Sequence, residues 1–562
     1  MNLTWLMATG AAQAAATPLP AGLHPADFVM VVAYLLLTAG IVVWSALRQT
    51  GTDSFFLGNR QMPWWAVGLS IMATLLSSIS YLGLTGEMVK HGASMFGTYL
   101  GWPFAMLLVV PLVIPFFMTL RLTNAYGYLE QRFDRRVRLL GSVLFLLLRL
   151  GWISMVMFTA SLALSSMAGW DLPTVIFVLG VVAAISACFG GFEAVIWTDV
   201  LQALMLFGGA ACIVLFVWLK TGAGPTGWWE TATAVQQTHT RPVWFSADPR
   251  VRMTFFTVAI NGFFWQFCTH LSDQVVLQRY SSTPSLAAAR KSYLVNMLSA
   301  LSIGVLLGLA GLALLHFYTV RPDRLAEGMT PTASGDRLMP WFYAHELPTG
   351  FAGLILANFL CDAMQTLVAG VNSIAAVAVA DLGGGTGQAE QAPTAAGAGA
   401  TGAGRQLRSA RFLTLFLGLI CTFSALGIHT LSEQLDMNIV DLMPRAFNLF
   451  LGPLAALFVC GLFVPRVSAR AMLPAGLLAV GISVVWSYWR PLTGAAYDLS
   501  PFWAIWVPCV SGVVLATLFS LFDQTASRHA GRHWTWQAVM RTPGARPQVR
   551  SRHRSPRAES EC

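Results

Sequence analysis

Long apolar runs separated by short polar segments recur along almost the whole chain. A helix needs about 20 apolar residues to cross the hydrocarbon core of a bilayer. Thirteen runs approach that length, at residues 27–47, 64–87, 95–119, 139–167, 174–191, 195–219, 253–271, 292–318, 350–380, 409–431, 438–465, 471–489 and 501–522. The pattern predicts an all-α polytopic membrane protein with about thirteen transmembrane helices, surrounded by the lipid bilayer.

Three segments outside these runs differ from them in composition. Residues 1–26 contain no Lys or Arg, residues 383–404 are rich in Ala and Gly, and residues 523–562 contain eight arginines. An Ala and Gly composition is typical of a flexible linker, and the Arg-rich tail lacks the apolar periodicity of a packed segment. We expect an extracytoplasmic N-terminus, a flexible cytoplasmic linker and a disordered cytoplasmic tail.

An odd number of spans places the two termini on opposite sides of the membrane. Short cytoplasmic loops carry an excess of Lys and Arg. If the Arg-rich tail is inside, roughly 23 of the 34 basic residues are inside, and this number includes the eight arginines of the tail. We therefore expect the N-terminus outside and the C-terminus in the cytoplasm, in a plasma membrane such as the bacterial inner membrane.

The composition agrees with a membrane protein and excludes several other classes. Of 562 residues, 56% are hydrophobic and only 10% are charged, whereas soluble domains carry about 25% charged residues. The eight cysteines are too few for a disulfide scaffold. The net charge of +9 comes mostly from loops and the tail, so it does not indicate nucleic-acid binding, and nothing indicates an obligate protein partner.

Polar residues inside the second span form the first unusual cluster. Ser77, Ser78 and Ser80 are followed by Gly83 and Gly86. An unpaired polar group in hydrocarbon costs several kcal/mol, and a broken helix uses such residues to turn freed carbonyls toward an ion. The alternative is a face of small residues that packs against another helix.

The seventh span contains a second cluster of this kind. Asn261 and Gln266 lie within the apolar run, and Asp273 and Gln274 follow it. Two polar-interrupted segments five spans apart indicate inverted repeats. For Asp273 and Gln274, the alternative is a polar helix end near the cytoplasm.

The ninth span contains Asp362, Gln365 and Thr366. Their spacing of i, i+3 and i+4 puts them on one helix face. Carboxylate, amide and hydroxyl oxygens are ligands for a hard cation. Mutual hydrogen bonding among the three side chains is the alternative.

Two further charged residues lie inside predicted spans. Asp199 lies about one turn into the sixth span, where it either coordinates an ion or pairs with a loop arginine. Arg149 lies deep in the fourth span, where a guanidinium needs an acid or carbonyl partner, or an anionic substrate. A structural ion pair is the favoured interpretation of Arg149.

Common enzyme motifs are absent from the sequence. It has neither a Gly-rich phosphate loop followed by Lys and Ser or Thr nor a His-Glu-x-x-His motif. The sequence therefore does not predict an enzyme.

Several segments together resemble the sodium/solute symporters, a family that includes bacterial sugar, proline and sialic acid carriers and the iodide carrier. The resemblance covers about residues 27–465. The segments that carry it are 55–65, 128–133, 190–202, 273–280 and 372–381. It implies a leucine-transporter-like fold with a 5+5 inverted repeat, which would place a ten-helix transport core at 64–465, an extra N-terminal helix at 27–47 and additional C-terminal helices at 471–522.

The resemblance also implies alternating access driven by a sodium gradient. A sodium ion would bind between the broken second span and the ninth span. Its ligands would be the carbonyls of Ala73 and Leu76 and the side chains of Asp362, Gln365 and Thr366. The family usually has serine or threonine where this chain has Asp362 and Gln365, so a proton remains an alternative coupling ion.

Asp199 corresponds to a position along the inner sodium path of the family. The resemblance places the substrate pocket at Ser77, Ser78, Ser80, Tyr99, Trp102, Arg149 and Gln266. Arg149 lies near the position where a sialic acid carrier has an arginine for a carboxylate. The expected function is sodium-coupled symport of a small organic solute, either a sugar or an organic anion such as a sialic acid. A proton-coupled symporter of the same fold and a symporter-like sensor module are the alternatives.

Overall fold

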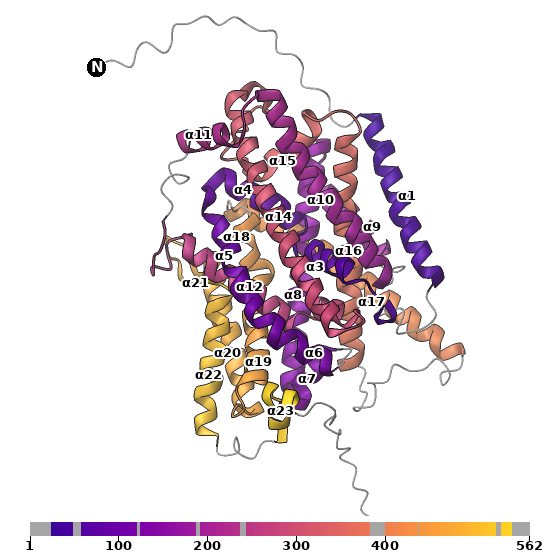
Figure 1. Ribbon diagram of the computed structural model, residues 1–562, viewed down its shortest axis with the longest axis vertical. Helices are drawn as coiled ribbons and strands as arrows, with labels where there is room; N and C mark the ends of the chain where they lie inside the picture. The colour runs from indigo at the N-terminus through magenta and orange to yellow at the C-terminus, as the bar shows by residue number, and fades with distance from the viewer. Residues whose placement is uncertain are drawn as a thin grey trace, which may run out of the picture.

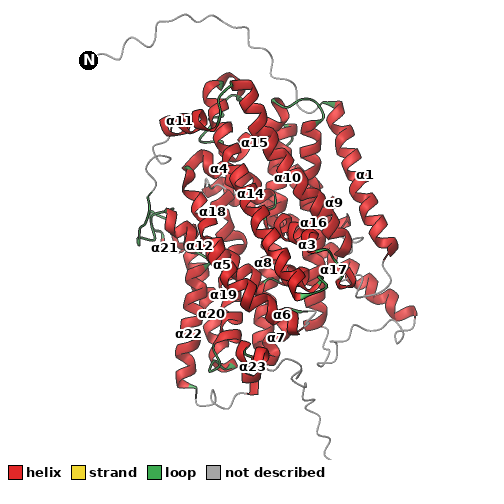
Figure 2. Ribbon diagram, viewed as in Figure 1, coloured by secondary structure: helices red, strands yellow, loops and turns green. Residues whose placement is uncertain are grey.

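The computed structural model describes residues 24–48, 58–120, 124–186, 192–235, 243–382, 400–435, 437, 439–523 and 530–541. These residues form helices and loops, with no strand among them (Figure 2). Most of the long helices run along one direction and form a single bundle (Figure 1). The predicted all-α fold is confirmed.

Each of the thirteen predicted spans coincides with one helix or with a pair of consecutive helices. They are α1 (Pro25–Arg48), α3 (Trp64–Leu75) with α4 (Ser78–His91), α5 (Gly97–Leu108) with α6 (Ile114–Leu120), α8 (Arg135–Ala168), α9 (Leu172–Ser186), α10 (Phe192–Thr221), α12 (Phe255–Ser272), α14 (Leu286–Val320), α16 (Phe351–Leu382), α17 (Ala400–Leu435), α18 (Ile439–Met443) with α19 (Leu449–Phe463), α20 (Ala469–Ser487) and α22 (Trp506–Phe522). Shorter helices lie between or after them: α7 (Ala125–Arg132), α11 (Pro225–Val235), α13 (Gln274–Ser281), α15 (Gly335–His345), α21 (Trp489–Thr493) and α23 (Trp536–Arg541).

By length and composition, ten of the described helices can cross a membrane, or eleven if the bent pair α3 and α4 counts as one span. The other two predicted spans differ for physical reasons. The apolar part of α9, Leu172–Ala184, is short. Helix α12 contains Asn261, Gln266 and His270, which lower its hydropathy.

Two helices are interrupted where the sequence places polar clusters. Helices α3 and α4 meet at an angle of 61°, and Leu76 between them has φ −113° and ψ 66°. Helix α12 ends and α13 begins at Asp273, whose backbone is extended. The predicted break in the second span is therefore present. Gly83 also allows close helix packing, because a Cβ there would lie 3.2 Å from Ile439 on α18.

The remaining helices enclose this core. Helix α1 lies at the edge of the bundle against α16 and α10, and α20 and α22 pack against α19. Asp27 at the start of α1 accepts hydrogen bonds from the backbone N–H groups of Gly350 (2.8 Å) and Gly353 (2.9 Å). In Figure 1, α1 begins at the upper end of the bundle and α22 ends at the lower end.

A segment after α22 returns to the bundle, which corrects the prediction of disorder for residues 530–541. Here η10 (Ala530–Trp534) packs against α7, and α23 packs against α6 and α19. The Trp536 indole donates to the Leu112 carbonyl (2.9 Å), and the Tyr128 hydroxyl donates to the Trp534 carbonyl (3.1 Å). Two tryptophans thus provide the packing surface that the arginine content of this segment obscures.

Leu112 lies in η3 (Val109–Val113), a π-helical turn between α5 and α6. Pro111 within this turn has no backbone N–H to donate. In a π turn a carbonyl accepts from the N–H five residues later, where an α-helix has the N–H four residues later. In the docked segment, a Cβ on Gly531 would collide with the backbone carbonyl of Arg132, so the close approach requires glycine.

Parts of the predicted outer segments fall outside the described residues. These are 1–23 of the N-terminus, 383–399 of the Ala and Gly linker, and 524–529 and 542–562 of the tail. Residues 400–404 were expected to belong to the linker, but they form the first turn of α17.

Candidate functional site

Two neighbouring cavities lie on either side of the break between α3 and α4. The first, here called the carboxylate cavity, is small and is lined by residues that include Asp199 and Asp362. The second, here called the aromatic cavity, is larger and is lined mainly by aromatic and aliphatic side chains. Leu76, at the break itself, lines the aromatic cavity, whereas Ala73 lines the carboxylate cavity.

Asp362 on α16 is bound directly to the broken helix. It is 2% exposed, and its Oδ2 accepts a hydrogen bond from the backbone N–H of Ser78 at 2.8 Å. Its Oδ1 accepts from Nε2 of Gln202 on α10. A carboxylate at the N-terminus of α4 interacts favourably with the helix dipole, so Asp362 ties α16, α10 and α4 together.

The same contact leaves backbone carbonyls of α3 without their helical donors. The N–H of Ser78 donates to Asp362 and not to the carbonyl of Thr74. A helix end leaves its last carbonyl groups without intrahelical partners. The break thus presents carbonyl oxygens, including that of Ala73, beside the carboxylate cavity.

Gln365 and Thr366 line the carboxylate cavity together with Asp362. The buried Oε1 of Gln365 has no hydrogen-bond partner within the described chain. An unsatisfied buried oxygen costs about 1–3 kcal/mol, and a cation would satisfy it. The donor set of carboxylate, amide, hydroxyl and carbonyl oxygens suits a hard cation.

Asp199 on α10 has an arginine partner, as one of its two interpretations expected. Nη2 of Arg279 on α13 lies 2.9 Å from Oδ2 of Asp199. The Ser70 hydroxyl donates to the same oxygen at 2.5 Å. Arg279 donates in turn to Ser70 (2.8 Å) and to Thr74 (2.7 Å), so this cluster joins α3, α10 and α13.

Arg149 on α8 forms an ion pair with Asp273, at the junction of α12 and α13. Both side chains are about 95% buried, at 4% and 5% exposure. The partner of Arg149 is thus a protein acid, in agreement with the structural ion pair that the sequence favoured. Arg149 lines the carboxylate cavity, and its guanidinium carbon lies 5.8 Å from the ring centroid of Trp152.

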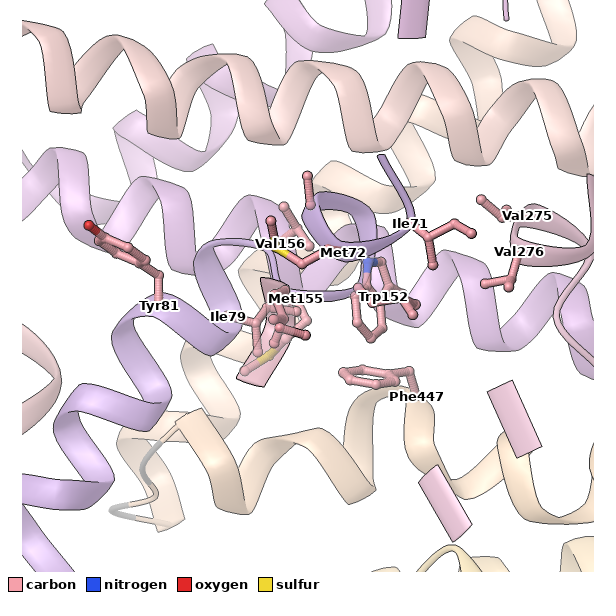
Figure 3. Close-up of a cluster of buried hydrophobic side chains, with 14 of the residues drawn as sticks. Ile71, Met72, Ile79, Tyr81, Trp152, Met155, Val156, Val275, Val276 and Phe447 are labelled. Atoms are coloured by element: carbon pink, nitrogen blue, oxygen red, sulfur yellow. The ribbon is translucent and has the colours of Figure 1, made fainter. Parts of the chain in front are cut away.

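The aromatic cavity is built from rings on several helices. Tyr99 and Trp102 of α5 meet edge to face with centroids 4.9 Å apart. Trp152 of α8 and Phe447 of η7 (Pro444–Asn448) are 4.8 Å apart. Figure 3 shows Trp152 beside Phe447 and near Ile79, just after the break between α3 and α4.

An ion-pair cluster lies beside the aromatic cavity. Arg252 binds Glu87 of α4 with two hydrogen bonds, of 2.6 and 3.0 Å, and binds Asp441 of α18 at 3.0 Å. The Arg252 guanidinium also lies 5.9 Å from the ring of Phe502, which lines the cavity. This cluster, Arg252 with Glu87 and Asp441, is here called the mouth cluster and links three segments beside the cavity.

The structure divides the predicted substrate residues among several places. Ser80, Tyr99 and Trp102 line the aromatic cavity, and Arg149 lines the carboxylate cavity. Ser77, Ser78 and Gln266 are buried but line neither of the two cavities. The Ser78 hydroxyl is hydrogen-bonded to the Thr159 hydroxyl at 2.9 Å, which gives it a structural role.

The predicted sodium residues lie closer together. Five of them line the carboxylate cavity: Ala73, Asp199, Asp362, Gln365 and Thr366. Gln202 and Arg279 were not predicted as site residues, although both lie in segments that carry the family resemblance. Gln202 could have been found from the sequence, because it is a polar side chain inside the apolar run 195–219.

The family model described as "Sodium:solute symporter family" matches residues 55–479. The sodium/sialic acid symporter NanT of Aliivibrio fischeri is 28% identical over 82% of this chain and 87% of its own length. The sodium/sialic acid symporter SiaT of Proteus mirabilis is 29% identical over the same shares. The human sodium/iodide cotransporter is 27% identical over 84% of this chain and 71% of its own length.

Among solved structures, the substrate-bound outward-open state of a Na⁺-coupled sialic acid symporter has a TM-score of 0.72 and 26% identity, covering 89% of this chain and 98% of that one. Mhp1, a nucleobase-cation-symport-1 family transporter, has a TM-score of 0.51 at 13% identity over 85% of this chain and 98% of that one. The second likeness concerns the fold alone.

Proposed function

Because the chain belongs to the sodium:solute symporter family, we propose that its two cavities hold the two transported species. The carboxylate cavity binds sodium, and the aromatic cavity binds the organic solute. The resemblance noted in the sequence is confirmed, and the chain is a sodium-coupled secondary transporter with a leucine-transporter-like fold, not an enzyme.

The observation that carries the sodium assignment is the position of three side chains of α16 opposite the break. Asp362, Gln365 and Thr366 line one small cavity with Ala73. The carbonyls of Ala73 and Leu76 and the three side chains supply the oxygen ligands. Asp362 also balances the charge of the ion, which serine or threonine at this position would not do.

The ion and the solute meet at the same broken helix, and this contact couples their transport. Leu76 lines the solute cavity three residues after Ala73. Sodium bound at the break fixes the position of α4 relative to α16, and α4 supplies Ser80 to the solute cavity. Binding of one species therefore preorganises the site of the other.

Opening to either side of the membrane requires polar contacts to separate. On one side these are the bonds of the mouth cluster. On the other they are the pairs of Arg279 with Asp199 and of Arg149 with Asp273. With the N-terminus outside, the mouth cluster faces the exterior and the two buried pairs lie toward the cytoplasm, because α4 ends at the same side where α1 begins (Figure 1).

Uptake into proteoliposomes tests the proposal. Vesicles that contain the full chain are given a panel of radiolabelled sugars, sialic acids, monocarboxylates and vitamins, with an inward gradient of sodium or of choline. We expect accumulation of a panel solute in sodium only. Equal uptake in choline that collapses with a proton ionophore would show proton coupling in place of sodium coupling, and the absence of any gradient-driven accumulation would contradict a symporter.

A further inference from the structure

The aromatic cavity has a lining without charge. Among the described residues that line it, none is Asp, Glu, Lys or Arg. A carboxylate that enters a buried cavity loses several kcal/mol of hydration that no opposite charge in this lining offsets. The lining therefore favours an uncharged solute.

The charged groups next to this cavity are already paired. Arg149 lies behind Trp152 and is bound to Asp273. Arg279 is bound to Asp199. If sodium binds as proposed, Asp362 balances its charge, so the ion offers no net positive charge to an anionic solute.

The mouth of the cavity also disfavours anions. The mouth cluster combines the single positive charge of Arg252 with the carboxylates of Glu87 and Asp441. Lys90 nearby is paired with Asp336 at 3.2 Å. A negatively charged solute would approach two carboxylates and one guanidinium, and like charges repel.

The lining does offer unpaired hydrogen-bonding atoms. The indole Nε1 atoms of Trp102 and Trp152, Oγ1 of Thr98, and Oδ1 of Asn261 and Asn448 are buried without a hydrogen-bond partner in the described chain. Two of these atoms only donate, and the amide oxygens only accept. A solute that satisfies these atoms must carry both hydrogen-bond acceptors and donors. A cation without acceptor atoms cannot pair with the indole N–H groups.

The rings supply the rest of the recognition surface. Tyr99, Trp102, Trp152, Trp265 and Phe447 all line the cavity. Aromatic rings bind flat or apolar faces of ligands over a large area, and a typical small-molecule site combines such surfaces with a few polar groups. A compact ring with polar substituents at its edge fits both features.

We propose that the aromatic cavity selects an uncharged ring compound with both hydrogen-bond donors and acceptors, and that Trp152 screens Arg149 from that solute. This inference rests on the proposed function and specifies its solute class. It also sets this chain apart from its relatives named for the anions sialate and iodide.

Solutes that differ only in charge test this selection. We would use D-galactose with D-galacturonate, N-acetylneuraminate methyl ester with N-acetylneuraminate, and nicotinamide with nicotinate and 1-methylnicotinamide. Binding to the purified full chain in sodium chloride is measured by calorimetry and by the shift in melting temperature. We expect an uncharged member of at least one set to bind about tenfold more tightly than its charged counterparts.

Two variants locate the selectivity. Trp152→Arg places a guanidinium in the cavity and should reverse the preference toward the carboxylate of the same set, whereas Trp170→Arg, at a tryptophan that is 52% exposed, should not. If Trp152→Arg does not fold, Asn261→Asp serves instead. The added carboxylate keeps acceptor oxygens at this position and should weaken binding of the carboxylate member of a set more than binding of its uncharged member. A larger loss for the uncharged member would contradict the inference.

Several results would overturn the inference. One is tighter binding of a carboxylate, or of 1-methylnicotinamide, than of the uncharged member of the same set. Another is binding of a carboxylate that is lost in Arg149→Lys. The last is failure of every uncharged member to bind. Uptake in the proteoliposome assay separates this inference from the proposed function. Sodium-driven uptake of a carboxylate would leave the symporter assignment intact and refute only the solute class.

Discussion

Arg279 on α13 and Asp199 on α10 form a buried ion pair at 2.9 Å between residues that are 80 positions apart in the chain. The pair joins the second interrupted helix to the first half of the bundle, and Ser70 and Thr74 of α3 complete it. Removing one partner of a buried pair leaves an uncompensated charge, which costs about 3–5 kcal/mol.

We therefore expect both Arg279→Gln and Asp199→Asn to lower the melting temperature, because the first variant leaves a buried carboxylate and the second a buried guanidinium. Asp199→Asn should slow or uncouple transport while the protein still folds. The double variant should be more stable than Arg279→Gln alone. Thermal melting in detergent measures the effect on stability, and sodium-driven uptake measures the effect on transport. If the losses in melting temperature of the two single variants add up in the double variant, the two side chains act independently.

Thr366→Ala should raise the sodium concentration for half-maximal uptake several-fold, because one oxygen ligand is lost. Ser373→Ala is the matched control. It removes a hydroxyl from the same helix, but that hydroxyl donates to the carbonyl of Ala369 at 2.9 Å. An unchanged sodium dependence in a well-folded Thr366→Ala protein would remove Thr366 from the ion site.

Arg252→Ala should open the aromatic cavity to the exterior, because it removes the guanidinium that joins Glu87 to Asp441. The measurement is the rate at which a membrane-impermeant thiol reagent labels Ser80→Cys from outside, relative to the background from native cysteines. The rate should rise in Arg252→Ala but not in Arg250→Ala, whose own pair with Asp248 is exposed at 3.7 Å. Equal rates would show that the mouth cluster does not control access.

The architecture was largely predictable from the sequence, because apolar length and polar interruptions are local properties. Ser77, Ser78 and Ser80 marked the region of the break in the second span, and each apolar run became a helix or a helix pair. The end of α12 was predictable as well, because the seventh apolar run ends at residue 271 and the helix ends at Ser272.

The partners inside the site could not be predicted in the same way. Gln202 and Asp362 are 160 positions apart, and Arg149 and Asp273 are 124 positions apart. No local pattern encodes such distances. The aromatic lining was predicted only in part, at Tyr99 and Trp102. Trp152 and Phe447 were missed, because they lie in apolar segments and have the same pattern as residues that face lipid or the core.

Trp536→Ala should lower the melting temperature by a few degrees, because the ring packs against the bundle and its N–H donates to the Leu112 carbonyl at 2.9 Å. Trp170→Ala is the control, since that side chain is 52% exposed. Equal melting temperatures for the two variants would show that the docked segment adds no stability.

The docking of residues 530–541 has a practical consequence for handling the protein. A fluorescent protein or affinity tag joined directly after Asp523 would replace the segment that covers α7, whereas a tag joined beyond Arg541 would leave that segment in place. Two preparations that differ only in the attachment point would then differ in whether this segment is bonded to Tyr128 and Leu112 at that end of the bundle.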